Sequence, residues 1–75
     1  MRRVGTVDRV ADGRLVVRSA DESVPDIGSE VLSEDLATVG TVVDVFGPVD
    51  RPYLAVTPDD GVHPAALVGA PLYTR

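Results

Sequence analysis

Short apolar stretches rich in valine recur along the whole chain, separated by glycine, proline and acidic residues. Valine is β-branched and favours strands. Turn residues at such short intervals are typical of an all-β sandwich or barrel. No stretch keeps the period of 3.6 residues that an amphipathic helix requires. The pattern therefore predicts a small barrel of about six short strands.

The beginning of the chain predicts a β-hairpin, with strands over residues 3–10 and 14–19. Asp12-Gly13 suits a two-residue type I′ turn, because both turn positions need positive φ. Side chains alternate along a strand, so this turn also predicts which residues share a face. The expected pairs are Val10–Leu15, Asp8–Val17 and Val7–Arg18. The expected core face holds Val4, Val10, Leu15 and Val17, and the outer face holds Val7, Arg9, Arg14, Val16 and Arg18.

The rest of the chain predicts four more strands. We expect a loop over 20–28, a short strand over 30–32 and a polar turn over 33–35. The strongest strand is expected over 37–46. Further strands are expected over 53–57 and 72–74, with a turn over 58–61. Residues 62–69 are either one helical turn or irregular. Alternation over 37–46 places Val39, Thr41, Val43 and Val45 on one face and Thr38, Gly40, Val42, Asp44 and Phe46 on the other.

Length and composition limit the classes of protein. A chain of 75 residues and 7.9 kDa is expected to form one domain over 1–75. It has no cysteine, so disulfides and thiolate metal sites are excluded. No apolar run approaches the ~20 residues of a membrane span, and the first residues lack an apolar signal core. We therefore expect a cytoplasmic protein with no membrane association.

Charge is distributed unevenly. Residues 1–18 hold five arginines and two aspartates, whereas residues 19–75 hold two arginines and ten acids, for a net charge of -5. The chain has no lysine. Excess acid without lysine is typical of proteins from salt-loving archaea, where carboxylates maintain hydration. A halophilic archaeal origin is therefore a hypothesis, which full stability in dilute buffer would contradict.

Candidate chemistry is sparse. The single histidine, His63, precedes a proline in a predicted turn and is best interpreted as an exposed loop residue. Asp59 and Asp60 belong to an Asp-Asp-Gly turn, where carboxylates usually bond the local backbone. One histidine without cysteine does not provide a usual zinc site. We expect no catalytic residue, no metal and no cofactor.

Two surfaces remain as candidates for binding. Arg9, Arg14 and Arg18 form a basic face of the first hairpin, which is either a solvated surface or a contact to RNA or an acidic partner. The segment 46–53 is the second candidate, because two prolines, a glycine and two aromatics make a stiff, partly apolar protrusion. Rigid aromatic groups lose little entropy on docking. Alternatively, Phe46 and Tyr53 belong to the core.

This second segment resembles a known family. Residues 39–49, which include Asp-Val-Phe-Gly-Pro-Val, and Pro-Tyr-Leu-Ala-Val at 52–56 are similar to the core of the GAR subunit of H/ACA ribonucleoproteins. Val-Gly-Thr-Val at 4–7 and Gly-Arg-Leu-Val-Val-Arg at 13–18 fit that family's first hairpin. Residues 67–73 resemble its closing segment. The glycine-arginine-rich tails of eukaryotic members are missing, as in an archaeal form with the core alone.

The resemblance implies a six-stranded β-barrel of the translation-factor (reductase/isomerase/elongation factor) type. It also implies a non-catalytic subunit, a monomer within its complex, that docks on the pseudouridine synthase of the H/ACA particle and assists loading and release of ribosomal RNA. Association with the guide RNA would be indirect. The residues that the resemblance assigns to the interface and its frame are Phe46, Gly47, Pro48, Val49, Pro52 and Tyr53. Arg51 joins them as a candidate because arginine is a favoured interface anchor.

A second interpretation comes from another class of small barrels. PRC-barrel proteins also have short strands and Gly-Thr-Val-Val-Asp-like stretches, and they bind ribosomal components during ribosome maturation. They differ in lacking the Phe-Gly-Pro-Val and Pro-Tyr combination. An enzyme is a third and more distant interpretation, which pseudouridine formation by the isolated chain would support.

Overall fold

The first hairpin of the computed structural model, which covers residues 1–75, consists of β1 (Arg2–Ala11) and β2 (Arg14–Ser19). Its turn is formed by Asp12 and Gly13, both with positive φ, as the sequence predicts. The remaining strands are β3 (Glu30–Leu32), β4 (Thr38–Phe46), β5 (Tyr53–Pro58) and β6 (Pro71–Thr74). A short 3₁₀ helix, η1 (Pro64–Leu67), occupies the stretch for which the sequence left two possibilities.

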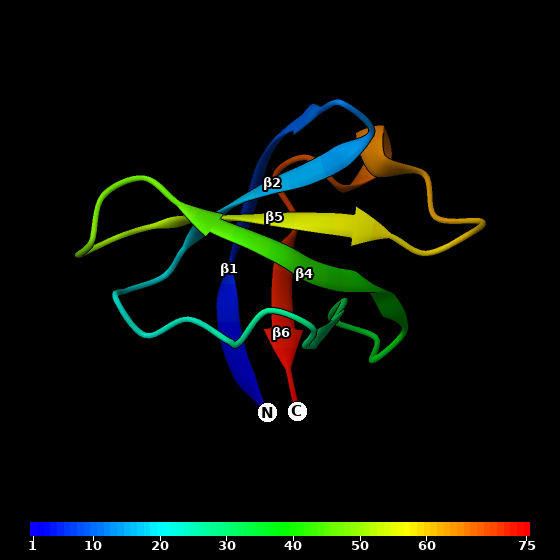
Figure 1. The fold of residues 1–75 in the computed structure, drawn as a ribbon. Coiled ribbons are helices and arrows are strands. Elements are labelled where there is room, and N and C mark those ends of the chain that lie inside the picture. The colour runs from blue at the N-terminus through cyan, green and yellow to red at the C-terminus, as the bar shows by residue number, and fades with distance from the viewer.

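The six strands close into a barrel in the order β1-β2-β5-β4-β3-β6, and every neighbouring pair is antiparallel (Figure 1). The all-β, six-stranded barrel is therefore confirmed. No helix has the length and apolar character needed to cross a membrane.

The inside of the barrel is filled mainly by valine and leucine. Its core comprises Val4, Val7, Leu15, Val17, Val31, Val39, Val42, Leu54, Val56 and Leu72. Four partly buried residues, Val24, Val45, Val62 and Leu67, pack against this cluster. Branched side chains of similar size fill a narrow barrel without leaving cavities.

The predicted register of the first hairpin is correct for the pair next to the turn. It is wrong on the far side of Asp8. Val10 pairs with Leu15 as expected, but Val17 pairs with Val7 instead of Asp8. A β-bulge adds one residue between Val7 and Arg9, which reverses the alternation beyond it. Val7 is therefore in the core at 1% exposure rather than on the outer face. Val10 lies next to the turn and is 37% exposed rather than part of the core.

The predicted faces of β4 are also wrong, for the same reason. Pairing shifts by one residue near Val39 on the β3 side and near Val43 on the β5 side. Val39 and Val42 consequently both lie in the core, and Val45 packs against it. Strict alternation assigns Val42 to the opposite face from the other two. These bulges bend β4 around the barrel.

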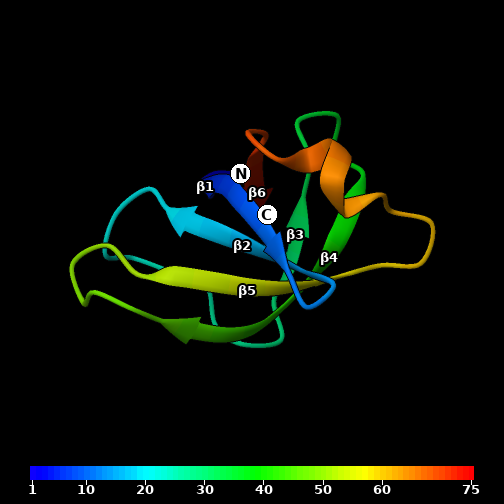
Figure 2. The ribbon, with the colours of Figure 1, turned by 90° about the horizontal axis from the view of Figure 1, so that it is seen from above.

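The loops are divided between the two ends of the barrel. The β2–β3 and β4–β5 loops project from the same end in both ribbon views (Figure 1, Figure 2). The β5–η1 turn projects from the opposite end. The chain termini lie side by side, because β1 pairs with β6.

Candidate docking surface

The β4–β5 loop, residues 47–52, is closed at its base by two stacked aromatic rings. Phe46 and Tyr53 pair across the two strands. Their ring centroids are 5.6 Å apart, with an angle of 18° between the ring planes. Offset stacking at this distance is favourable. Gly47 follows Phe46 with φ of +87°, a left-handed conformation that turns the chain away from the strand.

The side chains of this segment differ sharply in exposure. Val49 at the tip is 91% exposed and Phe46 is 39% exposed. Pro48 is also exposed, whereas Pro52 is buried and Tyr53 is half-buried. Pro52 therefore belongs to the frame of the loop. Val49, Pro48 and the exposed part of Phe46 are available to a partner.

The loop is attached to the end of β2 by two hydrogen bonds. The Arg51 side chain donates from Nε to the Ser19 carbonyl oxygen at 3.1 Å. The Ser19 amide donates to the Pro52 carbonyl oxygen, also at 3.1 Å. These bonds join the last residues of the loop to a neighbouring strand, so the protrusion has a fixed base.

Tyr53 connects this loop with the basic face of the first hairpin. Arg18 donates from Nη1 to the Tyr53 hydroxyl at 2.8 Å, and its guanidinium carbon lies 4.9 Å from the ring centroid. The guanidinium carbon of Arg9 lies 5.7 Å from the same centroid. Both distances are typical of cation–π contacts. Arg14 is exposed beside the turn and does not join this group.

The sequence treats the basic hairpin and the 46–53 segment as separate candidates, whereas the structure brings them together. The reason is the pairing of β2 with β5, which places Arg18 opposite Tyr53. That pairing joins residues 35 positions apart, and no local pattern in the sequence indicates it.

Two further apolar residues lie beneath this group on the outer side of the sheet. Val16 and Ala55 pair with each other and alternate with core residues, yet they are only 5% and 8% exposed. The Arg9 side chain starts opposite Val16 and ends over the Tyr53 ring, so it crosses this part of the sheet. Long arginine side chains commonly cover apolar surface in this way.

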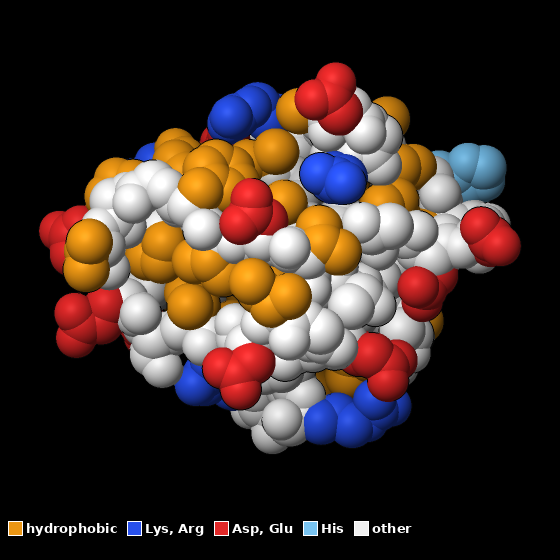
Figure 3. All heavy atoms as spheres, viewed as in Figure 1, with side chains coloured by type: hydrophobic (Ala, Val, Ile, Leu, Met, Phe, Trp, Pro, Cys, Tyr) orange, Lys and Arg blue, Asp and Glu red, His pale blue; other side chains and the backbone are white.

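Val43, at the bulge of β4, adds an outward apolar side chain that is 36% exposed. Figure 3 shows hydrophobic side chains gathered over β2, β5 and β4 on the side toward the β4–β5 loop, with a few carboxylates between and around them. We call this surface the aromatic face and define it by Val43, Phe46, Pro48, Val49 and Tyr53. Val43 does not stand out in the sequence, because strict alternation treats it as an ordinary strand residue.

The other chemical candidates of the sequence lie in or next to the β5–η1 turn. His63 is exposed immediately before η1, and Asp59 and Asp60 are exposed in the β5–η1 turn. The structure contains no group of three or more histidine, aspartate or glutamate side chains placed to hold a metal ion.

A family model described as "Gar1/Naf1 RNA binding region" matches residues 1–75, the whole chain. The chain belongs to the Gar1/Naf1 family. The family match and the named relatives identify the barrel as a GAR1 core domain.

Three relatives show how far the similarity extends. An uncharacterized protein of Methanothermobacter thermautotrophicus is 31% identical over 77 residues, covering 97% of this chain and 82% of that protein. The probable H/ACA ribonucleoprotein complex subunit 1 of Dictyostelium discoideum is 33% identical over 80% of this chain. The H/ACA ribonucleoprotein complex subunit GAR1 of Chaetomium globosum is 27% identical over 80% of this chain. The chain corresponds to 26% and 29% of the lengths of these last two proteins.

Proposed function

We propose that this chain is a non-catalytic subunit of an H/ACA ribonucleoprotein, in which the barrel docks on the pseudouridine synthase subunit as a single copy. In this role it assists loading and release of ribosomal RNA during RNA-guided pseudouridylation, and it contacts the guide RNA only indirectly. Family membership supports the kind of particle. The observation that carries the docking role is the aromatic face.

The aromatic face has the composition of an interface. Aromatic residues and arginine are enriched at the centres of protein interfaces. Here the stacked rings of Phe46 and Tyr53, with two arginines against Tyr53, form the base of the loop. The tip of that loop is Val49, which is almost fully exposed. In a chain with net charge -5, such an apolar group has no role in solubility. Its attachment to β2 by Arg51 and Ser19 means that little ordering is needed on binding.

Salt should affect this docking only weakly. Screening at molar salt removes most attraction between exposed charges, whereas burial of apolar surface persists. A complex that depends on Phe46, Val49 and Tyr53 should therefore form in molar KCl. The catalytic groups are expected to belong to the synthase, as the resemblance to the family implies.

The test is complex formation with the synthase of the same cell in molar KCl, followed by size exclusion and by single- and multiple-turnover assays. We expect a one-to-one complex and faster multiple turnover. The isolated chain should form no pseudouridine in a uridine-containing RNA. A folded chain that forms no complex would contradict the proposal.

The critical variant is Val49→Asp, because Val49 is exposed and its substitution should leave the barrel intact. Placing a carboxylate in an apolar interface should weaken the complex at least about tenfold. Val68→Asp is the matched control, since Val68 is 51% exposed between η1 and β6. Equal affinities for the two variants would remove Val49 from the interface.

A further inference from the structure

A second feature is a cavity of about 240 Å³. It lies between the β4–β5 loop, the first half of β1 and the end of β2. Its lining residues are Arg3, Gly5, Thr6, Arg18, Ser19, Ala20 and Arg51. Three of the seven arginines in the chain line it, and none of the twelve acids does. This cavity is therefore strongly positive in a protein that is acidic overall.

The three arginines are not neutralised by neighbouring acids. The one ion pair in the structure joins Arg9 and Asp8. Arg3 donates to the Thr6 hydroxyl at 2.9 Å, Arg18 to Tyr53, and Arg51 to the Ser19 carbonyl. Each bond uses one of the five donor hydrogens that a guanidinium carries. Because these bonds go to neutral groups, the positive charges of all three residues stay uncompensated around a single cavity.

The arrangement of the donors indicates the shape of the anion. Arg3 comes from β1, Arg18 comes from β2, and Arg51 comes from the β4–β5 loop. Donors therefore approach from three segments. A planar carboxylate presents two oxygens in one plane and can be satisfied by one guanidinium. A tetrahedral phosphate presents oxygens in several directions and suits convergent donors better.

We propose that this cavity binds a phosphate group. The phosphate is either the free inorganic ion or a phosphodiester of an RNA backbone, because both present the same tetrahedral oxygens. The proposal goes beyond the docking function and does not depend on the synthase.

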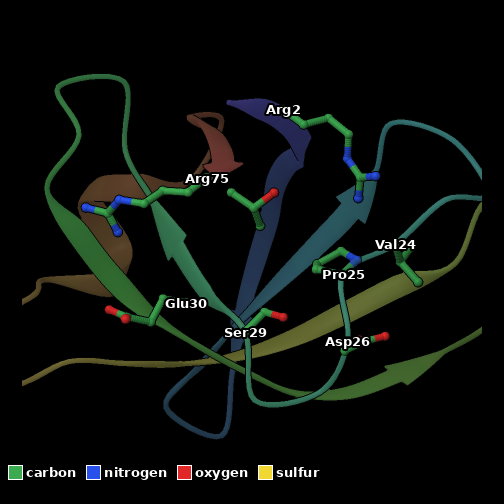
Figure 4. Close-up of a pocket in the computed structure, with 8 residues that line it drawn as sticks. Arg2, Val24, Pro25, Asp26, Ser29, Glu30 and Arg75 are labelled. Carbon is green, nitrogen blue, oxygen red and sulfur yellow. The ribbon is translucent and has the colours of Figure 1, made fainter.

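A larger groove beside the chain termini lacks these properties. It measures about 620 Å³ and contains two acids, Asp26 and Glu30, as well as Arg2 and Arg75. In Figure 4 the two guanidinium groups point to opposite sides of this groove. Its charges are mixed, and no anion is indicated there.

The test is an NMR titration of the isolated chain with inorganic phosphate at fixed ionic strength, with chloride as the balancing anion. We expect saturable shifts of the Ser19 and Thr6 amides and of the arginine side-chain Nε–H signals. A short oligoribonucleotide forms the second arm. Shifts of the same signals at lower concentration than phosphate assign the site to RNA, and a response to phosphate alone assigns it to the free ion.

Variants separate a specific site from general charge. Arg51→Gln and Arg3→Gln should each weaken phosphate binding about tenfold, the usual effect of one charge-assisted hydrogen bond. Arg14→Gln, outside the cavity, should change it less than twofold.

Two outcomes would overturn the proposal. One is the absence of saturable shifts with both phosphate and the oligoribonucleotide while the barrel signals remain those of the folded chain. The other is an equally strong response to acetate, which would assign the cavity to a carboxylate, such as an acidic side chain of a protein partner.

Discussion

Two hairpin loops of this barrel, β1–β2 and β4–β5, both connect antiparallel neighbours, but turn geometry explains the residues of the first loop and not those of the second. The first turn consists of Asp12 and Gly13, with φ of +52° and +73°. Those residue types are the ones that a tight turn requires. The second loop contains six residues and presents a valine that is 91% exposed. Closing a hairpin requires neither this length nor the exposed apolar tip.

The difference teaches where to look for binding in a small barrel. A loop whose residues are explained by its backbone geometry gives no indication of a partner. The β4–β5 loop has a stacked aromatic base, two stiff prolines and hydrogen bonds to β2. Together they keep the apolar side chain of Val49 exposed to solvent. Such a combination opposes solubility, so we infer that it is maintained for docking.

The strongest test of this comparison is Tyr53→Ala. The ring stacks on Phe46 and lies beneath Arg9 and Arg18, and its hydroxyl accepts a hydrogen bond. Losing these contacts should reduce the free energy of unfolding by about 2–3 kcal/mol. Urea unfolding measures this loss. Tyr53→Phe keeps the ring and should lose only about 1 kcal/mol. A Tyr53→Ala variant as stable as the Phe variant would show that the aromatic base does not support the loop.

A smaller loss of stability is expected from alanine substitutions at Gly13 and Gly47, and the two losses should differ. Gly13 and Gly47 both have positive φ, so an alanine at either position should reduce stability by about 1 kcal/mol. An added Cβ at Gly13 meets nothing within 4 Å, whereas at Gly47 it would lie 3.0 Å from Cδ2 of Tyr53. Gly47→Ala should therefore lose about 1 kcal/mol more than Gly13→Ala and should also weaken synthase binding. Equal melting temperatures would contradict the role assigned to the Gly47–Tyr53 contact.

The smallest effect concerns the β3–β4 turn, which resembles the first turn in being built from polar residues. The Ser33 hydroxyl and the Ala37 amide both donate to Asp35 and lower the pKa of its carboxyl below 3.8. Because the pKa is depressed in the folded state, the stabilisation is present above the unfolded value and is lost as pH falls through the folded value. Asp35→Asn should flatten the pH dependence of the melting temperature in this acidic range only. Since the carboxylate is exposed, the change should be smaller than in the other variants.

Much of the fold can be predicted from the sequence because strands and turns are local. The short β3 strand and the Asp12-Gly13 turn follow from neighbouring residues alone. The faces of β1 and β4 cannot be predicted by alternation, because bulges near Asp8, Val39 and Val43 each insert a residue. A bulge is a consequence of closing the barrel and has no distinct local signature in these valine-rich strands.

The candidate site could be predicted only in the parts that depend on neighbouring residues. The segment 46–53 stands out by its own composition, and Val49 is exposed as a protruding tip should be. The joining of Tyr53 with Arg9 and Arg18 depends on the pairing of distant strands. The cavity formed by Arg3, Arg18 and Arg51 depends on the same long-range arrangement. Residue types can be read locally, whereas their convergence requires the topology.

Closure of the barrel has a consequence for synthesis of the chain. The last strand, β6, pairs with the first strand, β1, and also completes the seam to β3 through the Leu32–Tyr73 pair. Until β6 has emerged from the ribosome, both β1 and β3 have an unpaired edge, and the valine core is open on one side. Folding to the closed state must therefore follow translation of residue 74. During that interval the nascent chain is exposed to aggregation, and an acidic composition keeps it soluble.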